Sequence, residues 1–343
     1  MPTANRSRPA AVGSGVDPAQ LAAVWRRAHE ARARLLADPN TTACRLWHGD
    51  ADGIDGLVIE KLGDVLIAQL HEQRLALEES VIRGLCVRAA EELGARAVYR
   101  KVFPRERSQA RERLARALTD PTPWWGRAAE PEFPVLENGM RLLVRPYDGY
   151  STGLFLEQRD NRQRVRTLAR GRRVLNAFAY TCGFTVAATL GGAAEVVSLD
   201  LSKRFLEWGR RNLAANGLAA AGHTFICDEI FAYYRRARRQ ERRFDLIILD
   251  PPTFARAKRP RRAFSIARDL EALTTGALEL LDSGGDLLIS TNHRGTTPAH
   301  LERTVSAAAS SLGRPLASVE RLPLPEDFRG DPDYAKAMLA RVG

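Results

Sequence analysis

The strongest constraint on the fold is a regular alternation of two kinds of segment in the C-terminal half. Short apolar runs such as RRVLNAFAY, AEVVSLD and FDLIILD alternate with longer amphipathic runs such as SKRFLEWGRRNLAANG. Apolar strands separated by amphipathic helices are typical of a parallel sheet covered on both faces. The alternation predicts an α/β, Rossmann-like fold with a mostly parallel sheet. Ligands of such sheets bind beyond the carboxyl ends of the strands, so chemistry is expected there.

The N-terminal half shows a mixed pattern and predicts a separate domain. Short strand-like runs, CRLW, GLVIE and DVLIAQL, are followed by an amphipathic run, LEESVIRGLCVRAAEELG. The polar, proline-containing stretch 104–134 is interpreted as a long loop. The predicted organisation is a disordered tail (1–20), a helical lead-in (21–43), a small α+β accessory domain with an RNA-binding role (44–150) and the α/β domain (151–343).

The charge balance favours a polyanionic partner. The chain has 52 basic against 41 acidic residues, a net charge of +11, and the simplest such partner is a nucleic acid. Only five of the basic residues are lysines, and alanine is abundant, which indicates a GC-rich coding bias. Part of the arginine content is therefore expected to be background.

Several classes of protein are excluded by what the sequence lacks. No run approaches the roughly 18–20 apolar residues of a membrane helix, and the first residues have no apolar core of signal-peptide length. The four cysteines, Cys44, Cys86, Cys182 and Cys227, show no CxxC pair or metal-ligand spacing. We expect a cytoplasmic protein without a metal site or a disulfide framework.

The first apolar strand ends in a turn that leads into a helix. Asn176, Tyr180, Thr181 and Gly183 lie in this turn, and the helix is expected to begin at Phe184. Backbone N–H groups at a helix N-terminus favour an anionic ligand. The GxGxxG fingerprint is absent, which favours a ligand with a single carboxylate over a pyrophosphate. A plain turn between strand and helix would have the same pattern.

Acidic residues end the next two strands. Asp200 ends the second strand, where a carboxylate can accept both hydroxyls of a ribose, and Ser202 follows it. Asp228 ends the third strand, where a carboxylate can reach an adenine amino group. Either acid could instead be a helix N-cap. Two acids in these positions after such a loop favour an adenosine site.

The fourth strand ends in Asp250-Pro251-Pro252-Thr253-Phe254. Two prolines fix the backbone as it leaves the sheet, so that Asp250 and nearby carbonyl groups form a rigid set of acceptors. Such acceptors suit a planar, nitrogen-bearing group on which Phe254 could stack. A proline-rich turn is the alternative interpretation. The candidate catalytic residues are Asp250, Pro251, Pro252 and Phe254.

A basic loop follows this motif directly. A run of charge is usually a solvated face, but beside an active site these residues are expected to contact phosphates. A second run, from Arg235 to Arg243, ends a helix and could simply complement its dipole. The candidate phosphate ligands of the loop are Arg256, Lys258, Arg259, Arg261 and Arg262.

These residues carry a resemblance to a known family. The second domain resembles class I S-adenosylmethionine-dependent methyltransferases, and more narrowly the bacterial large-subunit rRNA methyltransferases that modify cytosine C5 or guanine N7. The similar segments are RLWHGDADGIDGLVIEKLGD, ENGMRLLVRPYDGYSTGLFLEQRDNR, LNAFAYTCGFTVAATLGGAAEVVSLDLSKRFLEWGRRNLAANGL and FDLIILDPPTFARAKR.

The resemblance implies S-adenosylmethionine as cofactor and assigns roles in binding it. The turn before Gly183 would cradle the methionine part, Asp200 the ribose and Asp228 the adenine, while Asp250 would lie beside the methyl transfer. The STGLFLEQRDNR segment would lie over the cofactor. The implied cofactor-binding residues are Phe155, Gln158, Arg159, Asn176, Tyr180, Thr181, Gly183, Asp200, Ser202, Asp228 and Asp250.

The chain departs from the cytosine-C5 branch in two ways. Only about 40 residues precede RLWHGDADG, too few for the PUA domain that many of those members carry. Cytosine C5 also needs a cysteine nucleophile, and neither candidate loop, after the fourth or the fifth strand, contains one. The second loop, Asn292-His293-Arg294-Gly295, resembles the guanine-N7 branch, and His293 and Arg294 join the candidate RNA ligands.

The sequence therefore predicts direct methyl transfer to a base nitrogen, with guanine N7 favoured, in RNA that is expected to be 23S rRNA. Guanine N7 is already nucleophilic and needs only positioning. The alternatives are an rRNA cytosine-C5 methyltransferase, a methyltransferase of a protein or small molecule, and a non-catalytic RNA-binding factor that keeps the fold. The oligomeric state, monomer or homodimer, is left open.

Overall fold

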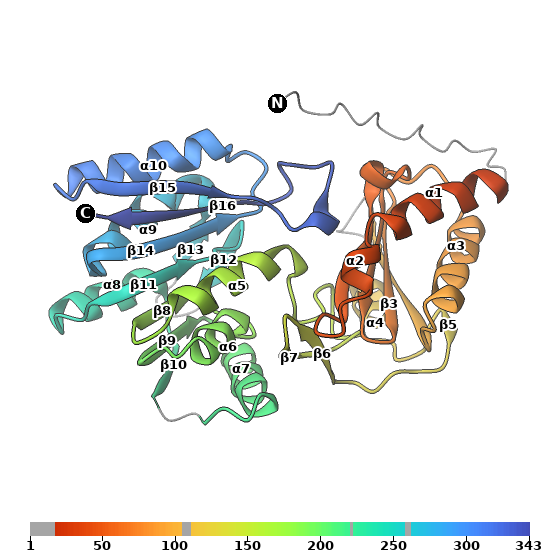
Figure 1. Ribbon diagram of the computed structural model, residues 1–343, viewed down its shortest axis with the longest axis horizontal. Helices are drawn as coiled ribbons and strands as arrows, with labels where there is room; N and C mark the ends of the chain where they lie inside the picture. Colours follow the sequence, from red (N-terminus) through yellow and green to blue (C-terminus); the bar gives the residue numbers. More distant parts are fainter. Residues whose placement is uncertain (1–17, 105–110, 220–221, 258–261) are drawn as a thin grey trace. The chain divides into compact units, whose positions relative to one another are not determined.

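The computed structural model describes residues 18–104, 111–219, 222–257 and 262–343 (Figure 1). The chain divides into two compact units. The first comprises residues Met1–Leu156 together with Glu326–Asp331, and the second comprises Glu157–Pro325 together with Pro332–Gly343. Each unit has its own hydrophobic core.

The first unit is built on a five-stranded sheet in the order β1-β2-β3-β4-β5. Neighbouring strands are antiparallel except β3 and β4, which are parallel and are connected through helix α3 (Glu79–Glu92). The strands are β1 (Ala43–His48), β2 (Leu57–Leu62), β3 (Val65–His71), β4 (Ala97–Phe103) and β5 (Trp125–Gly126).

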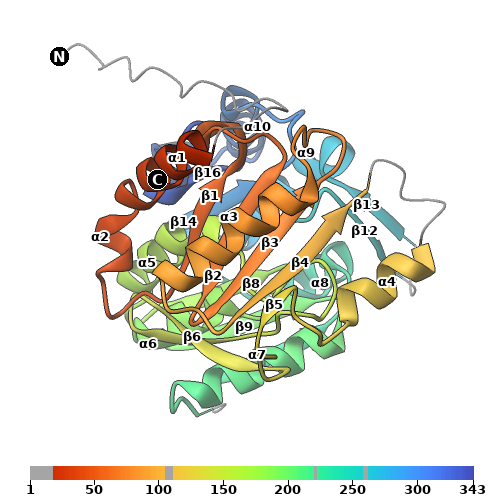
Figure 2. The same ribbon diagram turned by 90° about the vertical axis from the view of Figure 1, so that its right-hand side faces the viewer.

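Two helices cover one face of this sheet, as Figure 2 shows for α1 (Pro18–Glu30) and α3. Trp25 of α1 and Cys86 of α3 are buried in one core with strand residues such as Leu46 and Ile59. The remaining elements of the unit are short: α2 (Ala33–Leu36), the 3-10 helix η1 (Gly49–Asp52), α4 (Arg111–Thr119) and the hairpin of β6 (Phe133–Glu137) and β7 (Met140–Val144).

A segment from far along the chain completes the first unit. The 3-10 helix η3 (Glu326–Phe328) contacts β1, and the Asp327 carboxylate accepts the backbone N–H of Arg45 at 2.8 Å. Arg329 donates to Asp52 at 2.9 Å, and Asp52 also forms a fully buried ion pair with Arg32. A buried carboxylate needs such partners, so this segment is part of the unit's interior.

The second unit is built on a seven-stranded sheet in the order β10-β9-β8-β11-β14-β16-β15. The first five strands in this order are parallel, and β16 runs antiparallel to both of its neighbours. The strands are β8 (Arg173–Ala177), β9 (Glu195–Asp200), β10 (His223–Cys227), β11 (Phe244–Leu249), β14 (Leu281–Thr291), β15 (Leu316–Leu322) and β16 (Lys336–Val342). This confirms the predicted Rossmann-like, mostly parallel sheet.

Helices cover both faces of this sheet (Figure 1). Helices α8 (Ile230–Arg239), α9 (Ile266–Leu280) and α10 (Pro298–Ser311) share the main core with the strands. Helices α5 (Arg159–Leu168), α6 (Gly183–Leu190) and α7 (Lys203–Ala215) form the other layer, with α6 in contact with both α5 and α7. A small hairpin of β12 (Phe254–Ala257) and β13 (Arg262–Ser265) follows β11.

Four parts of the chain differ from the expectations. Residues 18–20, assigned to the tail, begin α1, while residues 1–17 lie outside the described part. The stretch 104–134 contains α4, β5 and the start of β6, so its interpretation as a single long loop is wrong. Strands β15 and β16 were not anticipated. The first unit ends at Leu156 and takes in residues 326–331, whereas the sequence placed one boundary at 150.

Candidate active site

The strand order sets the position of the site in the second unit. Strands β8 and β11 are neighbours whose connections lead to opposite sides, and in such sheets ligands bind where the strand order reverses. The predicted residues follow the carboxyl ends of β8, β9, β10 and β11, which meet at one edge because these strands are parallel. The topology therefore brings the predicted segments together.

The turn after β8 has an unusual backbone. Phe178, Tyr180 and Cys182 all adopt positive φ, at 60°, 48° and 62°. Such conformations are costly for residues other than glycine and concentrate at functional sites. The turn is held in place because Asn212 of α7 donates from its side chain to the carbonyl of Thr181 at 2.7 Å. The result is a rigid turn in front of α6.

Asp200 connects this turn to the end of β9. Its carboxylate accepts the backbone N–H of Tyr180 at 2.9 Å and that of Ser202 at 2.8 Å. Burial raises the pKa of Asp200, and the backbone hydrogen bonds oppose that rise. Ser202 is the N-cap of α7, and its hydroxyl accepts the N–H of Phe205 at 3.3 Å, which is a structural role. Asp200 is thus fixed in orientation at the rim of the site.

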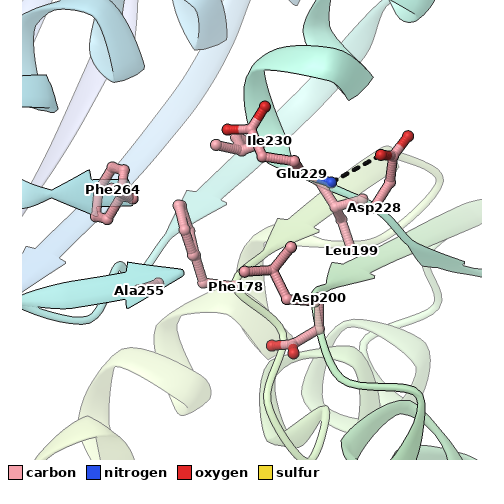
Figure 3. A pocket seen from close by; sticks show the side chains of 9 residues that line it. Phe178, Leu199, Asp200, Asp228, Glu229, Ile230, Ala255 and Phe264 are labelled. Atoms are coloured by element: carbon pink, nitrogen blue, oxygen red, sulfur yellow. Dashed lines mark hydrogen bonds between the residues drawn. The ribbon is translucent and has the colours of Figure 1, made fainter. Parts of the chain in front are cut away.

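An apolar pocket opens beside Asp200 (Figure 3). The ring of Phe178 lies between Asp200 and Leu199 on one side and Phe264 on the other, and the Phe178 and Phe264 ring centroids are 5.3 Å apart. A mostly apolar lining that includes aromatic rings suits the face of a flat ring system. The lining residues are Phe178, Leu199, Asp200, Leu201, Asp228, Glu229, Ile230, Ala255 and Phe264.

The two acids after β10 behave differently in this pocket. The Asp228 carboxylate accepts the Glu229 backbone N–H at 2.8 Å and forms an ion pair with Arg236, and Figure 3 shows it turned away from Phe178. The Glu229 side chain extends the other way and ends beside Ile230, at the start of α8. Its Oε2 caps α8 by accepting the Ala232 N–H at 3.0 Å, while its buried Oε1 has no hydrogen-bond partner among the described residues. Sequence reasoning missed Glu229 because its side chain was indistinguishable from a surface acid.

A second polar cluster follows β11. Asp250 accepts the Ser290 hydroxyl proton at 2.6 Å and the Gln158 side-chain amide at 3.1 Å, both at Oδ1. Asn161 donates in turn to Gln158 at 2.6 Å. Burial raises the pKa of Asp250, while the Ser290 hydrogen bond and the charge of Arg162 oppose the rise. Among the described residues none donates to Oδ2, so this oxygen can face a substrate.

Comparison with known proteins shows the family of the chain. A family model described as S-adenosylmethionine-dependent methyltransferase matches residues 97–341. The chain belongs to this methyltransferase family. A relative from Bacillus subtilis (strain 168), named “Putative ribosomal RNA large subunit methyltransferase YwbD”, is 32% identical over 317 residues, 92% of this chain and 77% of that protein. Ribosomal RNA large subunit methyltransferase I of Erwinia tasmaniensis is 34% identical over 76% of this chain and 63% of that protein.

Solved structures agree with this assignment. SMU.776, “a putative methyltransferase complexed with SAH”, superposes with a TM-score of 0.82 at 28% identity, covering 96% of this chain and 82% of that one. A methyltransferase structure from Streptococcus mutans gives a TM-score of 0.79 at 27% identity, with the same coverage. The chain is therefore an S-adenosylmethionine-dependent methyltransferase with the predicted fold, and S-adenosylmethionine is its cofactor.

The methyltransferase has two buried acceptors that fit this cofactor. Asn176 donates to Thr185 at 2.9 Å, but its Oδ1 has no partner among the described residues. Glu229 Oε1 is the second such atom. A buried acceptor without a donor is costly, and the cofactor carries N–H groups at its adenine and at its methionine end. Asn176 lies at the end of β8, and Glu229 lines the pocket beside Asp200, which is the candidate adenosine pocket. The two acceptors are therefore candidates for binding N–H groups at the two ends of the cofactor.

The segment implied to cover the cofactor is divided between the units of the methyltransferase. Gln158 takes part in the Asp250 cluster. Arg159 is buried on α5, and its Nε lies 3.5 Å from its neighbour Asp160. Phe155 belongs to the first unit and is 40% exposed. Its role toward the cofactor stays a prediction.

The candidate RNA ligands lie on two loops that meet. Thr253 donates to Asn292 at 3.3 Å, which joins the loop after β11 to the loop after β14. The His293 ring contacts Thr296, and Arg294 is exposed. Arg256 lies over the Phe254 ring at 5.4 Å. Lys258, Arg259 and Arg261 lie outside the described residues, as does the Arg262 side chain.

The cysteines differ from one another in exposure. Cys44, Cys86 and Cys182 are buried, and Cys227 is exposed. Burial raises the pKa of both Cys86 and Cys182 to about 12, which keeps these thiols protonated at neutral pH. Cys227 ends β10, and two strands, β9 and β8, separate β10 from β11. At about 4.8 Å per strand spacing, Cys227 lies roughly 14 Å from the strand that carries Asp250.

No described helix is long and apolar enough to cross a membrane. Within the described residues there is likewise no cluster of three or more histidine, cysteine or acidic side chains arranged to hold a metal ion.

Proposed function

We propose that this methyltransferase acts on a base nitrogen of large-subunit ribosomal RNA, with guanine N7 as the favoured atom and 23S rRNA as the substrate. The substrate class is supported by the names of the relatives from Bacillus subtilis and Erwinia tasmaniensis. The net charge of +11 is consistent with a polyanionic partner. An enzyme with this substrate would work in the cytoplasm, where bacterial ribosomes assemble.

The observation that carries the choice of nitrogen is the position of the thiols. Methylation at cytosine C5 needs a cysteine thiolate at the base, whereas a ring nitrogen is nucleophilic by itself. Among the described residues of the loops after β11 and β14 there is no cysteine, and Cys227 is separated from β11 by two strands. The site therefore supplies positioning and hydrogen-bond acceptors rather than a nucleophile.

Each residue after β11 has a proposed role in binding and orienting the base. The cofactor, when bound, supplies an electrophilic methyl group on its sulfonium. Asp250 has Oδ1 fixed by Ser290 and Gln158, so that Oδ2 can accept N–H groups of the base. Phe254 is 52% exposed and offers a face for stacking. Pro251 and Pro252 restrict the backbone between these two side chains, which reduces the cost of ordering the site.

The deciding experiment is a comparison of modified nucleosides in 23S rRNA. RNA would be isolated from cells with the gene, from cells without it, and from cells that carry either of two variants. One variant is Asp250→Ala, and in the other all four cysteines are replaced by alanine. Each RNA sample would be digested and its nucleosides analysed by mass spectrometry. We expect one 7-methylguanosine to disappear without the gene and with Asp250→Ala, and to persist in the cysteine-free variant.

Two outcomes would contradict the proposal. Loss of a 5-methylcytidine, with no activity in the cysteine-free variant, would favour the cytosine-C5 alternative. An unchanged nucleoside profile would favour a protein or small-molecule substrate, or a non-catalytic RNA-binding role. Binding of S-adenosylhomocysteine by each purified variant distinguishes a catalytic defect from a failure to fold.

A further inference from the structure

Six arginines lie within nine residues at the end of α8, from Arg235 to Arg243. Three of them are neutralised by acids that come from three different parts of the second unit. These ion pairs are Arg236–Asp228, Arg238–Glu279 and Arg242–Glu195. The other three are exposed and form no ion pair with any residue that the structure describes: Arg235, Arg239 and Arg243. The one acid of the segment, Glu241, is also exposed and pairs with none of them. The segment therefore carries an excess of positive charge that the fold does not offset.

The helix dipole explains only part of this charge. The partial negative charge at a helix C-terminus favours cations in the last turn, where three arginines already lie. Arg235 lies before that turn, and Arg243 lies beyond the helix. Arg235 and Arg239 are four residues apart, so they share one side of the helix and repel each other there. Arg243 donates to the carbonyl of Arg242 at 3.3 Å, which leaves its charge without a counter-ion. A negatively charged ligand would remove this repulsion.

An open hollow of about 580 Å³ lies at the end of α8. The charged residues of its lining are Arg238, Arg243, Glu279, Asp282 and Arg314. Both acids of the lining are already paired with arginines. Arg314 donates to the Leu278 carbonyl at the end of α9. Like Arg243, it forms no ion pair within the part of the chain that the structure describes. The hollow therefore offers two guanidinium groups to an anion from solution.

We propose that four arginines bind the phosphate backbone of the RNA substrate, and we call them the distal arginines: Arg235, Arg239, Arg243 and Arg314. This inference rests on the proposed function, which makes RNA the substrate. Four residues of an α-helix rise by about 6 Å, which is comparable to the separation of successive phosphates along a strand. A guanidinium binds a phosphate through two parallel hydrogen bonds. Contacts of this kind contribute affinity and orientation rather than base specificity.

The distal arginines lie far from the site of methyl transfer. Arg243 directly precedes β11, and Asp250 directly follows it. Seven residues of a strand, at about 3.3 Å each, place these two residues roughly 23 Å apart. A nucleotide bound at Asp250 cannot reach Arg243, so the second contact belongs to a distant part of the same RNA. The distal arginines should therefore affect the binding of long rRNA and leave the chemical step unchanged.

The test measures binding and methylation of 23S rRNA isolated from cells that lack the gene. In the first variant, Arg235, Arg239 and Arg243 are replaced by glutamine, which keeps helix propensity. We expect the slope of log RNA affinity against log salt to become shallower by about 0.7–0.9 for each lost contact. The KM for rRNA should rise by at least about tenfold, the least that one charged hydrogen bond contributes. Both kcat and the affinity for S-adenosylhomocysteine should equal those of the wild-type protein, which also shows that the variant folds.

Two matched variants separate a phosphate contact from a general effect of charge. Lysine at the same three positions keeps the charge and should keep the salt slope. Glutamine at three exposed arginines elsewhere, which also form no ion pair with a described residue, should leave the slope unchanged: Arg34, Arg170 and Arg303.

Three outcomes would overturn the inference while rRNA methylation by the wild-type protein stands. The first is a wild-type slope in the first variant, because the distal arginines would then serve an acidic protein partner or reflect coding bias. The second is an equal change of slope in the variant of the three arginines elsewhere. The third is a lysine variant that behaves like the first variant. If the wild-type protein does not methylate rRNA, the proposed function fails, and this inference fails with it.

Discussion

We propose that a single side chain, that of Glu229, makes the candidate adenosine pocket selective for adenine. The Glu229 carboxylate lines the adenosine pocket with one oxygen unpaired among the described residues, whereas Asp228 is engaged by Arg236 and by the Glu229 backbone. An acceptor in this position favours the 6-amino group of adenine and disfavours the 6-oxo group of hypoxanthine. Discrimination between the two bases therefore depends on whether the side chain of residue 229 accepts or donates a hydrogen bond at this position.

Glu229→Gln should change this discrimination. The oxygen of the new glutamine can still accept the N–H at the start of α8. Its NH2 group then takes the position of Glu229 Oε1 and donates where the carboxylate accepted. We expect affinity for S-adenosylhomocysteine to fall by about tenfold, in line with one charged hydrogen bond, and affinity for S-inosylhomocysteine to rise. Calorimetry with both ligands checks this. Asp228→Asn is the control, and equal changes in both ligands for Glu229→Gln would refute the assignment.

Because the pKa of Asp200 is raised, we expect ligand affinity and protein stability to change in opposite directions with pH. Burial raises its pKa, so its carboxylate is protonated at a higher pH than that of an ordinary aspartate. A protonated carboxyl accepts ribose hydroxyls poorly, so affinity for S-adenosylhomocysteine should fall as pH falls through this raised pKa. The unliganded protein binds the proton more tightly than the unfolded chain, so its free energy of unfolding should rise over the same interval.

The comparison with Asp200→Asn isolates this group from the others that titrate. Calorimetry between pH 7 and pH 4 gives the affinities, and denaturant unfolding at the same pH values gives the stabilities. The difference between wild type and variant should have opposite signs in the two measurements. Parallel changes would mean that the carboxylate does not contact the ligand.

At the level of helices, two glycines show how local space decides the effect of one substitution. Gly84 is exposed on α3, and nothing lies within 4 Å of a Cβ placed there. Gly276 on α9 lies against Tyr234, whose ring would be 2.3 Å from the new atom. Tyr234 is buried, and its hydroxyl donates to the Leu273 carbonyl at 3.2 Å, so the ring cannot easily move.

Alanine at these two positions should therefore have opposite effects. Gly84→Ala should stabilise the first unit by up to about 1 kcal/mol through helix propensity. Gly276→Ala gains the same propensity but overpacks the core at a cost of about 1–3 kcal/mol, so it should destabilise the second unit or at best leave it unchanged. Denaturant unfolding of both variants checks the signs, and stabilisation by Gly276→Ala would show that Tyr234 is free to repack.

The two faces of the β12–β13 hairpin carry different residues, one face toward the pocket and the other with the candidate RNA ligands. Ala255 pairs with Phe264 in the hairpin, and both line the candidate adenosine pocket, while Phe254 and Arg256 alternate with them.

Changing Arg256, Lys258, Arg259, Arg261 and Arg262 to serine should make the slope of log RNA affinity against log salt shallower by about 0.7–0.9 per lost phosphate contact. Affinity for S-adenosylhomocysteine should stay the same. An unaltered slope would mean that these arginines reflect coding bias.

The sequence was informative where structure is local and periodic. The β8–β14 region could be predicted because apolar strands alternate with amphipathic helices, and acids at strand ends stand out in such a pattern. Strand β15 could not, because its residues are mostly exposed and its pairing depends on β16. The Asp250 cluster joins Gln158 to Ser290, which are 132 positions apart, so only the folded chain brings them together.

For the molecule as a whole, the segment 326–331 makes the first unit discontinuous in sequence. Replacing it with glycine and serine residues of equal number removes the contacts of Asp327 and Arg329 with Arg45, Arg32 and Asp52. Since hydrogen bonds to charged groups contribute roughly 1.5–3 kcal/mol each, the first unit should lose at least about 3 kcal/mol. The second unit should still bind S-adenosylhomocysteine.

Hydrogen exchange checks this prediction because it reports on each unit separately. Amide exchange of α1 and β1 should become faster, with little change in β8 and β11. Glu326→Gln, which alters an exposed side chain of the same segment, is the control. Unchanged protection of β1 would show that the segment is dispensable for the first unit.

The same segment sets the order in which the newly made protein can mature. The hydrogen bond between Arg45 and Asp327 joins residues 282 positions apart. At a translation rate of about 5–20 residues per second, roughly 15–55 s pass between the synthesis of β1 and that of segment 326–331. The N-terminal unit, although begun first, cannot be completed until residues 326–331 have been made, near the end of synthesis. During this interval the Arg32 and Asp52 side chains of the nascent chain lack their contacts with residues 327 and 329. Nearly the whole protein must leave the ribosome before either unit is complete.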